Sequence, residues 1–254
     1  MKAINNSNSV FQNLNRLKAI TEIHFLELEK DEIKNHKKIV EISHVGKLLM
    51  NLDETSYIEK VCEVPDFLIN YNGNTLGIEH QTLTDNTDRS YEGFFENIFR
   101  HAESELKKNN SLPNFLANCW LYPKIEYKLN EKNAFIKLVV EIITEFIKSG
   151  HLIYNNIIEE ISLQPHSEIN VCPNFGAWWQ KYLTKDILQN AINEKEKRID
   201  DYRKSVKQIW LLIVIGGTKS SSYQISTHEN YNIATTFDRI YLLEDVYNNL
   251  YQLK

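Results

Sequence analysis

The chain has 254 residues, of which 42% are hydrophobic and 25% are charged, and its formal net charge is -5. This length and composition are typical of a globular protein with a sizeable core, and they exclude a small disulfide-stapled protein and a largely disordered chain. The acidic balance excludes a protein whose whole surface coats nucleic acid, so a nucleic-acid partner must be met by a local basic patch or by a partner subunit.

The N-terminal region, residues 1–52, is predicted to be helical. Apolar residues recur at helical spacing from Ser9 to about Leu52, and charged residues stand between them. The pattern indicates two helices with a break near Lys30 and Asp31.

Short apolar runs replace this periodicity after residue 56, and the dipeptide Asn72-Gly73 predicts two strands joined by a tight turn. Helical spacing returns from Tyr91 to Lys108, and Phe115 to Tyr122 is predicted to be a core strand. Residues 57–122 therefore form the predicted core of the fold, with the helical region before them.

Strand and helix alternate in the remainder of the chain. The predicted elements are a helix at Asn133–Lys148, a strand pair within Ile157–Val171, a long charged helix at Thr184–Ser205, and strands at Ile209–Ile215 and Arg239–Leu243. This order predicts an α/β fold with a mixed central sheet flanked by helices. Because no internal repeat and no linker rich in Pro, Gly or Ser marks a boundary, we expect one domain over residues 1–254.

Two further features bear on location. Cys62, Cys119 and Cys172 are odd in number and lack the paired spacing of a zinc site or of a secreted disulfide framework, which favours a reducing compartment. The N-terminus has no apolar stretch resembling a signal peptide, and the run from Trp210 to Ile215 is far shorter than the roughly 20 residues that span a bilayer. We expect a cytoplasmic protein without a membrane partner.

The Asn72-Gly73 turn also predicts the register of its β-hairpin, because both central positions of a type I′ turn need a positive φ. Counting outward from this turn pairs Phe67 with Ile78 and then Asp66 with Glu79. The two carboxylates are therefore expected to be direct neighbours across the hairpin.

Alternation along the strands places Asp66, Glu79 and Gln81 on one face, opposite an apolar face that must pack into the core. Like charges directly across a sheet repel, so a cation between Asp66 and Glu79 is expected to offset their repulsion. Carboxylate oxygens with few competing imidazoles or thiolates suit Mg²⁺ or Mn²⁺ better than zinc. We predict that Asp66 and Glu79 bind such an ion, which can activate water to hydrolyse a phosphodiester.

The spacing of these residues resembles a known motif. Pro65-Asp66, twelve intervening residues and then Glu79-His80-Gln81 are similar to the motif of the PD-(D/E)XK nuclease superfamily. The predicted elements around the hairpin also resemble the α-β-β-β-α-β core of that superfamily. The resemblance implies a restriction-endonuclease-like fold and a metal-dependent nuclease, with DNA as the expected substrate and restriction or genome defence as a typical context.

Gln81 stands where the motif has lysine, and this departure resembles the E-x-Q variant of some restriction endonucleases. Glutamine can orient a water but carries no positive charge, so the chemistry would depend more on the metal. In the later helix Lys195 lies on an otherwise apolar stripe, where it can replace the missing lysine in space. A lysine on such a stripe more often extends its ammonium to solvent.

The resemblance also implies an acidic residue from the first helix, for which Glu41 is the candidate and Glu22 the second choice. The expected catalytic residues are therefore Asp66, Glu79, Gln81 and Glu41.

Alternatives to this interpretation stay open. The hairpin can be an edge element whose solvent-facing side is polar, and the protein can be a catalytically inactive nuclease-fold module that binds nucleic acid or a protein partner. A homodimer or a complex with a partner subunit is compatible with the acidic charge. His80 alternates onto the apolar face with Ile78, so it is expected to be a core or interface histidine rather than a ligand.

Overall fold

The computed structural model describes residues 1–4, 8–28, 32–176 and 179–254, with the backbone alone for 32–34. The predicted break at Lys30 and Asp31 lies outside the described residues. The chain forms two compact units, of which unit 1 comprises Met1–Thr84 and Gln180–Lys254 and unit 2 comprises Asp85–Trp179. Helix α3 begins at Asn86, only four residues after strand β4 ends at Thr82, so no Pro-rich or Gly-rich linker announces the second unit in the sequence.

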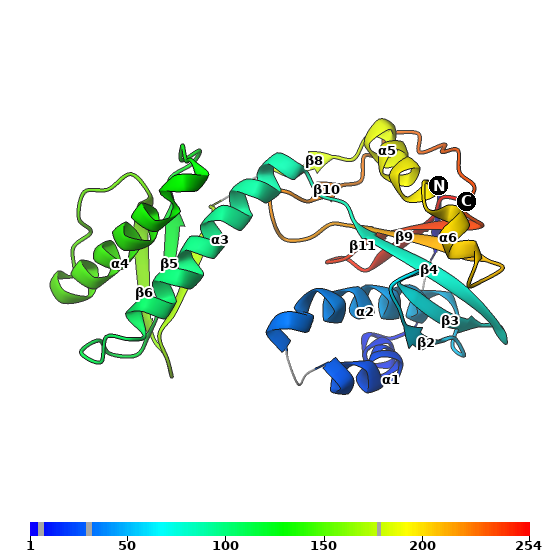
Figure 1. Ribbon diagram of the computed structural model, residues 1–254, viewed down its shortest axis with the longest axis horizontal. Coiled ribbons are helices and arrows are strands. Elements are labelled where there is room, and N and C mark those ends of the chain that lie inside the picture. The colour runs from blue at the N-terminus through cyan, green and yellow to red at the C-terminus, as the bar shows by residue number, and fades with distance from the viewer. Residues whose placement is uncertain (5–7, 29–31, 177–178) are drawn as a thin grey trace. The chain divides into compact units, whose positions relative to one another are not determined.

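Unit 1 is built on a seven-stranded mixed sheet with the order β1-β12-β11-β9-β4-β3-β2 (Figure 1). Neighbouring strands are antiparallel, except that β9 is parallel to both β4 and β11. The strands are β1 (Lys2–Ile4), β2 (Tyr57–Val61), β3 (Phe67–Tyr71), β4 (Asn74–Thr82), β9 (Ile209–Ile215), β11 (Arg239–Glu244) and β12 (Asn249–Gln252). Two short strands, β8 (Lys181–Tyr182) and β10 (Tyr223–Gln224), form a separate parallel pair.

Helices cover both faces of this sheet (Figure 1). Helices α1 (Val10–Leu28) and α2 (Glu32–Leu52) pack on one face, and α5 (Lys185–Glu196) and α6 (Ile199–Arg203) pack on the other. Within the described part of region 1–52, α1 and α2 confirm the predicted helices, and the edge strand β1 was not predicted. The single helix predicted over residues 184–205 is instead broken in two, because Arg198 leaves the helical conformation.

Strand β9 lies at the centre of the sheet and all its residues are buried. Trp210 and Leu212 join the core beneath α2, whereas Leu211 and Ile213 join the core beneath α5 and α6. A continuous apolar run is the pattern expected for a strand that is covered on both faces.

The predicted core over residues 57–122 needs one correction. The strand that pairs with β4 is β9 and not the strand at residues 115–121, which belongs to unit 2. The reason is burial: β9 is apolar on both faces, whereas every second residue of the 115–121 strand is only half-buried. Unit 1 therefore has the order α2, β2, β3, β4, α5 and α6, β9.

Unit 2 has a three-stranded sheet with β5 at its centre, antiparallel to β6 and parallel to β7. The segment 157–171 was expected to be a strand pair, but its two strands instead lie on opposite sides of β5. The elements are α3 (Asn86–Leu106), β5 (Phe115–Leu121), the 3₁₀ turn η2 (Leu129–Glu131), α4 (Lys132–Ser149), β6 (Ile158–Pro165) and β7 (Asn170–Asn174). Helices α3 and α4 pack with the sheet around an apolar core.

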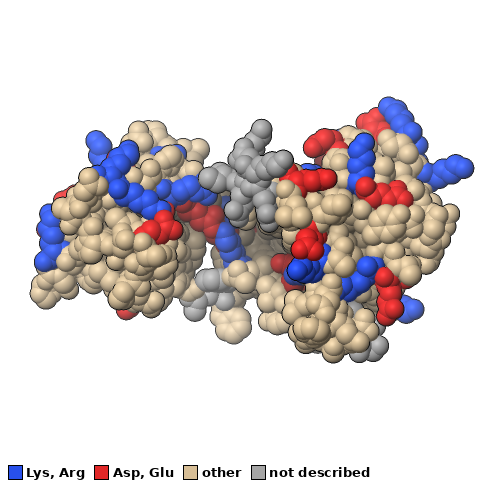
Figure 2. Space-filling view, turned by 90° about the horizontal axis from the view of Figure 1, so that it is seen from below, with Lys and Arg blue, Asp and Glu red and all other residues tan. Residues whose placement is uncertain are grey.

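On the face seen in Figure 2, basic side chains lie beside acidic ones in each unit. Among the described residues, the structure contains no helix with both the length and the apolar character needed to cross a bilayer.

Candidate active site

The predicted turn and register of the hairpin are confirmed. Asn72 and Gly73 both have positive φ, at 52° and 75°, as a type I′ turn requires. Strands β3 and β4 pair Tyr71 with Asn74 and Phe67 with Ile78. The sequence therefore predicted correctly which residues of this hairpin share a face.

Asp66 lies one residue before β3, and the same register continued by one step places it opposite Glu79. Its carboxylate oxygen Oδ2 accepts a hydrogen bond of 2.9 Å from the backbone N–H of His80. Gly77 permits this close packing at the start of β3, because a Cβ at that position would lie 2.7 Å from the ring of Pro65. Asp66 is thus held to β4 although it lies outside the regular ladder.

Glu79 is buried, with only 2% of its side chain exposed, and Lys195 of α5 pairs with it. The ammonium Nζ of Lys195 lies 2.7 Å from Oε1 of Glu79. A buried carboxylate needs a partner of this kind, because an isolated charge in the protein interior is costly. The structure therefore brings the lysine that the sequence offered as a substitute into direct contact with the motif glutamate.

The face of β4 that carries Glu79 packs against α5 and α6, and Tyr202 of α6 lies in that core. Burial, and after it the negative charge of Glu79, raises the pKa of the Tyr202 hydroxyl. At neutral pH this side chain is a neutral phenol beside the carboxylate.

Glu41 of α2 is linked to Asp66 by Lys38, a residue of the same helix. Lys38 of α2 places its ammonium 2.8 Å from Oε2 of Glu41 and 3.9 Å from Oδ1 of Asp66. Burial opposes the charge of Lys38, but its contacts with Glu41 and the charge of Asp66 raise its pKa, so this lysine stays cationic. Glu41 therefore stands next to the hairpin carboxylates, with Lys38 between it and Asp66.

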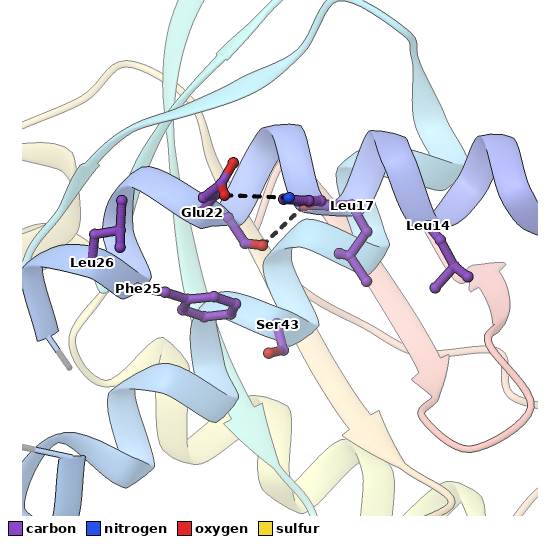
Figure 3. A pocket seen from close by; sticks show the side chains of 8 residues that line it. Leu14, Leu17, Glu22, Phe25, Leu26 and Ser43 are labelled. Atoms are coloured by element: carbon purple, nitrogen blue, oxygen red, sulfur yellow. Dashed lines mark hydrogen bonds and ion pairs between the residues drawn. The ribbon is translucent and has the colours of Figure 1, made fainter.

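Glu22, the second choice, lies elsewhere. It is on α1, where it forms an ion pair of 3.5 Å with Lys18 and lines a surface groove between α1 and α2 (Figure 3). No contact in the described structure joins it to Asp66 or Glu79, so its position does not support the second choice.

The charges at this site raise one pKa strongly. Burial and the nearby charge of Glu79 raise the pKa of Asp66 to about 6, although the His80 amide and the Lys38 ammonium oppose the shift. The charge of Glu79 thus disfavours ionisation of Asp66, and a bound cation would offset this repulsion.

Three polar atoms on this face lack a well-formed hydrogen bond among the described residues. They are Oε2 of Glu79, Oε1 of the half-buried Gln81 and the hydroxyl oxygen of Tyr202, which lies beside Glu79. The other oxygen of Glu79 holds Lys195. Buried polar atoms of this kind are rare, and a ligand site is one place where they occur. Gln81 thus directs an unpaired carbonyl oxygen from the same face as Glu79.

The described part of the chain contains no group of three His, Cys, Asp or Glu side chains arranged to hold a metal ion. Such a group is not required for Mg²⁺, which often binds through one or two carboxylates and keeps water and substrate phosphate as its other ligands. Asp66 and the free oxygen of Glu79 fit that requirement, whereas zinc would need more protein ligands.

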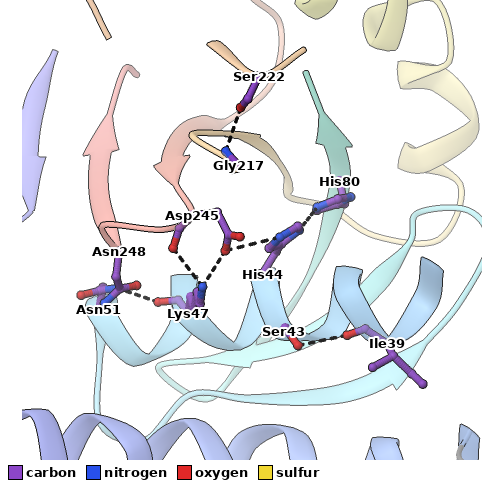
Figure 4. A network of polar contacts seen from close by, with 10 residues as sticks. All are labelled: Ile39, Ser43, His44, Lys47, Asn51, His80, Gly217, Ser222, Asp245 and Asn248. Atoms are coloured by element: carbon purple, nitrogen blue, oxygen red, sulfur yellow. Dashed lines mark hydrogen bonds and ion pairs between the residues drawn. The ribbon is translucent and has the colours of Figure 1, made fainter. Parts of the chain in front are cut away.

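The opposite face of β4 carries a second polar group of residues (Figure 4). His80 is buried, as predicted, and its Nε2 lies 2.9 Å from Nδ1 of His44 on α2. His44 in turn lies 3.5 Å from Asp245, which also accepts a hydrogen bond of 2.5 Å from Lys47. The hydrogen bond from His44, followed by that from Lys47, lowers the pKa of Asp245 to about 2 against the effect of burial.

Sequence reasoning missed Lys38, Tyr202 and the partnership of His44 with His80. Lys38 had a local signal, since it stands three residues before Glu41 and hence on the same side of the helix. No pattern in the sequence indicated the pair of His44 and His80, because these residues are 36 positions apart and belong to different elements.

Comparisons with known proteins do not extend these observations. No protein-family model matches the chain, and neither a curated protein nor a solved structure matches it.

Proposed function

We propose that this protein is a metal-dependent nuclease of the PD-(D/E)XK type that hydrolyses phosphodiester bonds in DNA. The observation that carries the proposal is the contact of 2.7 Å between Lys195 and Glu79, opposite Asp66. Lys195 supplies from helix α5 the positive charge that the resembled motif has as a lysine and that Gln81 on strand β4 lacks.

The topology of unit 1 supports a restriction-endonuclease-like fold. The antiparallel strands β2, β3 and β4 are followed in the sheet by β9, parallel to β4, with α5 and α6 between them in sequence. Helix α2 covers one face of these strands and α5 and α6 cover the other. This is the α-β-β-β-α-β order of the resembled superfamily, with unit 2 inserted after β4.

Asp66 and Oε2 of Glu79 would hold Mg²⁺ or Mn²⁺. When bound, such an ion polarises a phosphoryl oxygen and lowers the pKa of a water ligand. Lys195 binds Oε1 of Glu79 and leaves Oε2 for the ion, and Lys38 stabilises the ionised form of Asp66.

Two further side chains are suited to act on the substrate. The side chain of Lys195 is 25% exposed, and its ammonium would place positive charge where negative charge develops on a phosphate in the transition state. Oε1 of Gln81 can accept a hydrogen bond from a water and thereby orient it for attack. Glu41 holds Lys38 in place and is therefore a positioning residue in this scheme.

The acidic net charge limits how the protein would bind DNA. Because basic and acidic side chains are interspersed on the surface seen in Figure 2, long-range attraction for a polyanion is weak there. Phosphates would be met locally, by Lys38, Lys195 and the bound ion.

Cleavage assays test the proposal. The full chain is incubated with Mg²⁺ or Mn²⁺ and with linear, supercoiled and single-stranded DNA or RNA, and wild type is compared with Asp66→Ala and Glu79→Ala. Glu194→Ala is a matched control, because Glu194 is an exposed carboxylate on α5 that pairs with Lys197. We expect metal-dependent cleavage by wild type and by the control, and a loss of about 1000-fold in both site variants.

Two results would contradict this assignment. Cleavage that survives both site substitutions would show that Asp66 and Glu79 do not carry the chemistry. Binding of Mn²⁺ that is lost in both variants, with no cleavage of any substrate by wild type, would support the alternative of an inactive nuclease-fold module.

A further inference from the structure

Helix α1 exposes an unusual number of large apolar side chains. Among its described residues, Val10, Phe11, Leu14, Ile23 and Leu26 are all exposed. Beside them runs a groove of 370 Å³ between α1 and α2, lined by side chains of α1 and by Ser43 of α2 (Figure 3). Contiguous apolar surface rimmed by polar groups is typical of a protein interface.

The order of residues along this groove is self-complementary. Leu14, Lys18, Glu22 and Leu26 follow one another at intervals of four residues, so they form one row along the helix surface. All four line the groove. Leu14 and Leu26 are each 60% exposed, and the side chains of Lys18 and Glu22 are 70% and 55% exposed.

A two-fold axis midway between Lys18 and Glu22 would superimpose this row on itself in reverse. In an antiparallel pair of α1 helices, Leu14 of one protomer then faces Leu26 of its partner, and Lys18 faces Glu22. The contact of Leu14 with Leu26 and the contact of Lys18 with Glu22 each occur twice, as an isologous interface requires. The row reads apolar, basic, acidic, apolar from one end and apolar, acidic, basic, apolar from the other, so reversal sets each charge against its opposite.

We propose that α1 is the interface of a homodimer, in which two copies of this chain pack antiparallel through Leu14, Lys18, Glu22 and Leu26. The charge pattern favours a second copy over other occupants. A lipid surface would favour cationic side chains over a balanced pair. An unrelated protein would have no reason to match a row that is complementary to itself. The inference rests on unit 1 alone and does not depend on the proposed nuclease activity.

Charge reversal tests the pairing directly. Lys18→Glu leaves two negative charges in the row, and Glu22→Lys leaves two positive ones, so each variant alone would place like charges against like in its own homodimer. An equimolar mixture of the two variants restores both opposite-charge contacts. Analytical ultracentrifugation is expected to give twice the 29.9 kDa chain mass for wild type and for the mixture. Each variant alone should have a dimer dissociation constant raised at least about tenfold.

A second pair of variants tests the apolar contacts. Leu14→Asp and Leu26→Asp are each expected to give monomer, because each would bury a carboxylate against leucine. Leu129→Asp is the control, since Leu129 is an exposed apolar residue of unit 2. Far-UV circular dichroism and thermal unfolding verify that each variant is folded.

Three outcomes would overturn the proposal. The first is a wild-type chain that sediments as a monomer at about 100 μM, a concentration far above typical dissociation constants of specific dimers. The second is a mixture of Lys18→Glu and Glu22→Lys that stays as dissociated as the separate variants. The third is a dimer that Leu129→Asp disrupts as strongly as the two α1 substitutions do.

Discussion

Strand β4 carries polar side chains on both faces, and the two faces differ in how these groups are paired. On the face toward α2, His80 contacts His44, and the contacts continue to Asp245 and Lys47 (Figure 4). On the face toward α5, Glu79 contacts Lys195, yet one of its oxygens and the amide oxygen of its neighbour Gln81 are buried without a hydrogen bond.

This difference is the one expected between a structural network and the ligand site that we propose. Buried polar groups that are fully paired add rigidity, whereas unpaired ones cost about 1–3 kcal/mol each and persist where function requires them. We therefore expect substitutions on the Glu79 face to change activity or metal binding and substitutions on the His80 face to change stability.

Among these tests of the two faces, the largest expected effect is the loss of cleavage on substitution of Lys195. Lys195→Gln keeps a hydrogen-bond donor near Glu79 but removes the charge, so cleavage should fall about 100-fold while the fold is retained. Lys197→Gln, two residues away on the same helix and exposed, is the control. The measurement is the single-turnover cleavage rate. Equal rates for the two variants would mean that Lys195 has only a structural role.

Asp66 should show a pH-dependent effect on stability. Its pKa of about 6 in the folded chain exceeds the ordinary value of 3.8, so between these pH values the folded state binds more protons than the unfolded state. Stability therefore falls as pH rises through this window. Asp66→Asn removes the carboxylate whose ionisation the folded state disfavours. The increase in the free energy of unfolding that this substitution gives over wild type should therefore be about 2 kcal/mol larger at pH 7.5 than at pH 4.

Urea denaturation at both pH values measures this difference, with the exposed Asp200→Asn as control. The addition of Mg²⁺ at pH 7.5 should stabilise wild type and leave Asp66→Asn nearly unchanged. A stability difference that is the same at pH 4 and pH 7.5 would show that the Asp66 carboxylate is not under electrostatic strain.

The opposite face is tested with His44. His44→Leu fills the same space with an apolar side chain, but it leaves His80 without its partner and removes the hydrogen bond that Asp245 accepts from His44. The free energy of unfolding should therefore fall by about 2 kcal/mol. Cleavage per folded molecule should change little. His36→Leu, exposed on the same helix, is the control. Strongly reduced cleavage at unchanged stability would remove the distinction between the two faces.

Gln81 is expected to give the smallest effect on stability. Gln81→Leu replaces a buried unpaired amide oxygen with an apolar side chain, so the free energy of unfolding should rise, by up to about 1 kcal/mol. If the amide orients water, the cleavage rate should fall at the same time. Thermal unfolding and cleavage rates measured on one preparation test both, and a variant that is both less stable and fully active would refute the role of Gln81.

The sequence by itself determined the hairpin. Asn72-Gly73 specifies a turn, the turn specifies the register, and the two-residue period of a strand then decides that Asp66, Glu79 and Gln81 share a face. All of these relations act over a few residues and need no knowledge of the rest of the chain.

Only the tertiary structure decided what surrounds that face. The contact of Lys195 with Glu79 spans 116 residues, and the choice of β9 over β5 beside β4 depends on which strand can be buried on both faces. Unit 2 stands between these segments in sequence with no linker signal. Such long-range choices follow from how whole layers of helix and sheet bury their apolar surfaces, and no local pattern encodes that packing.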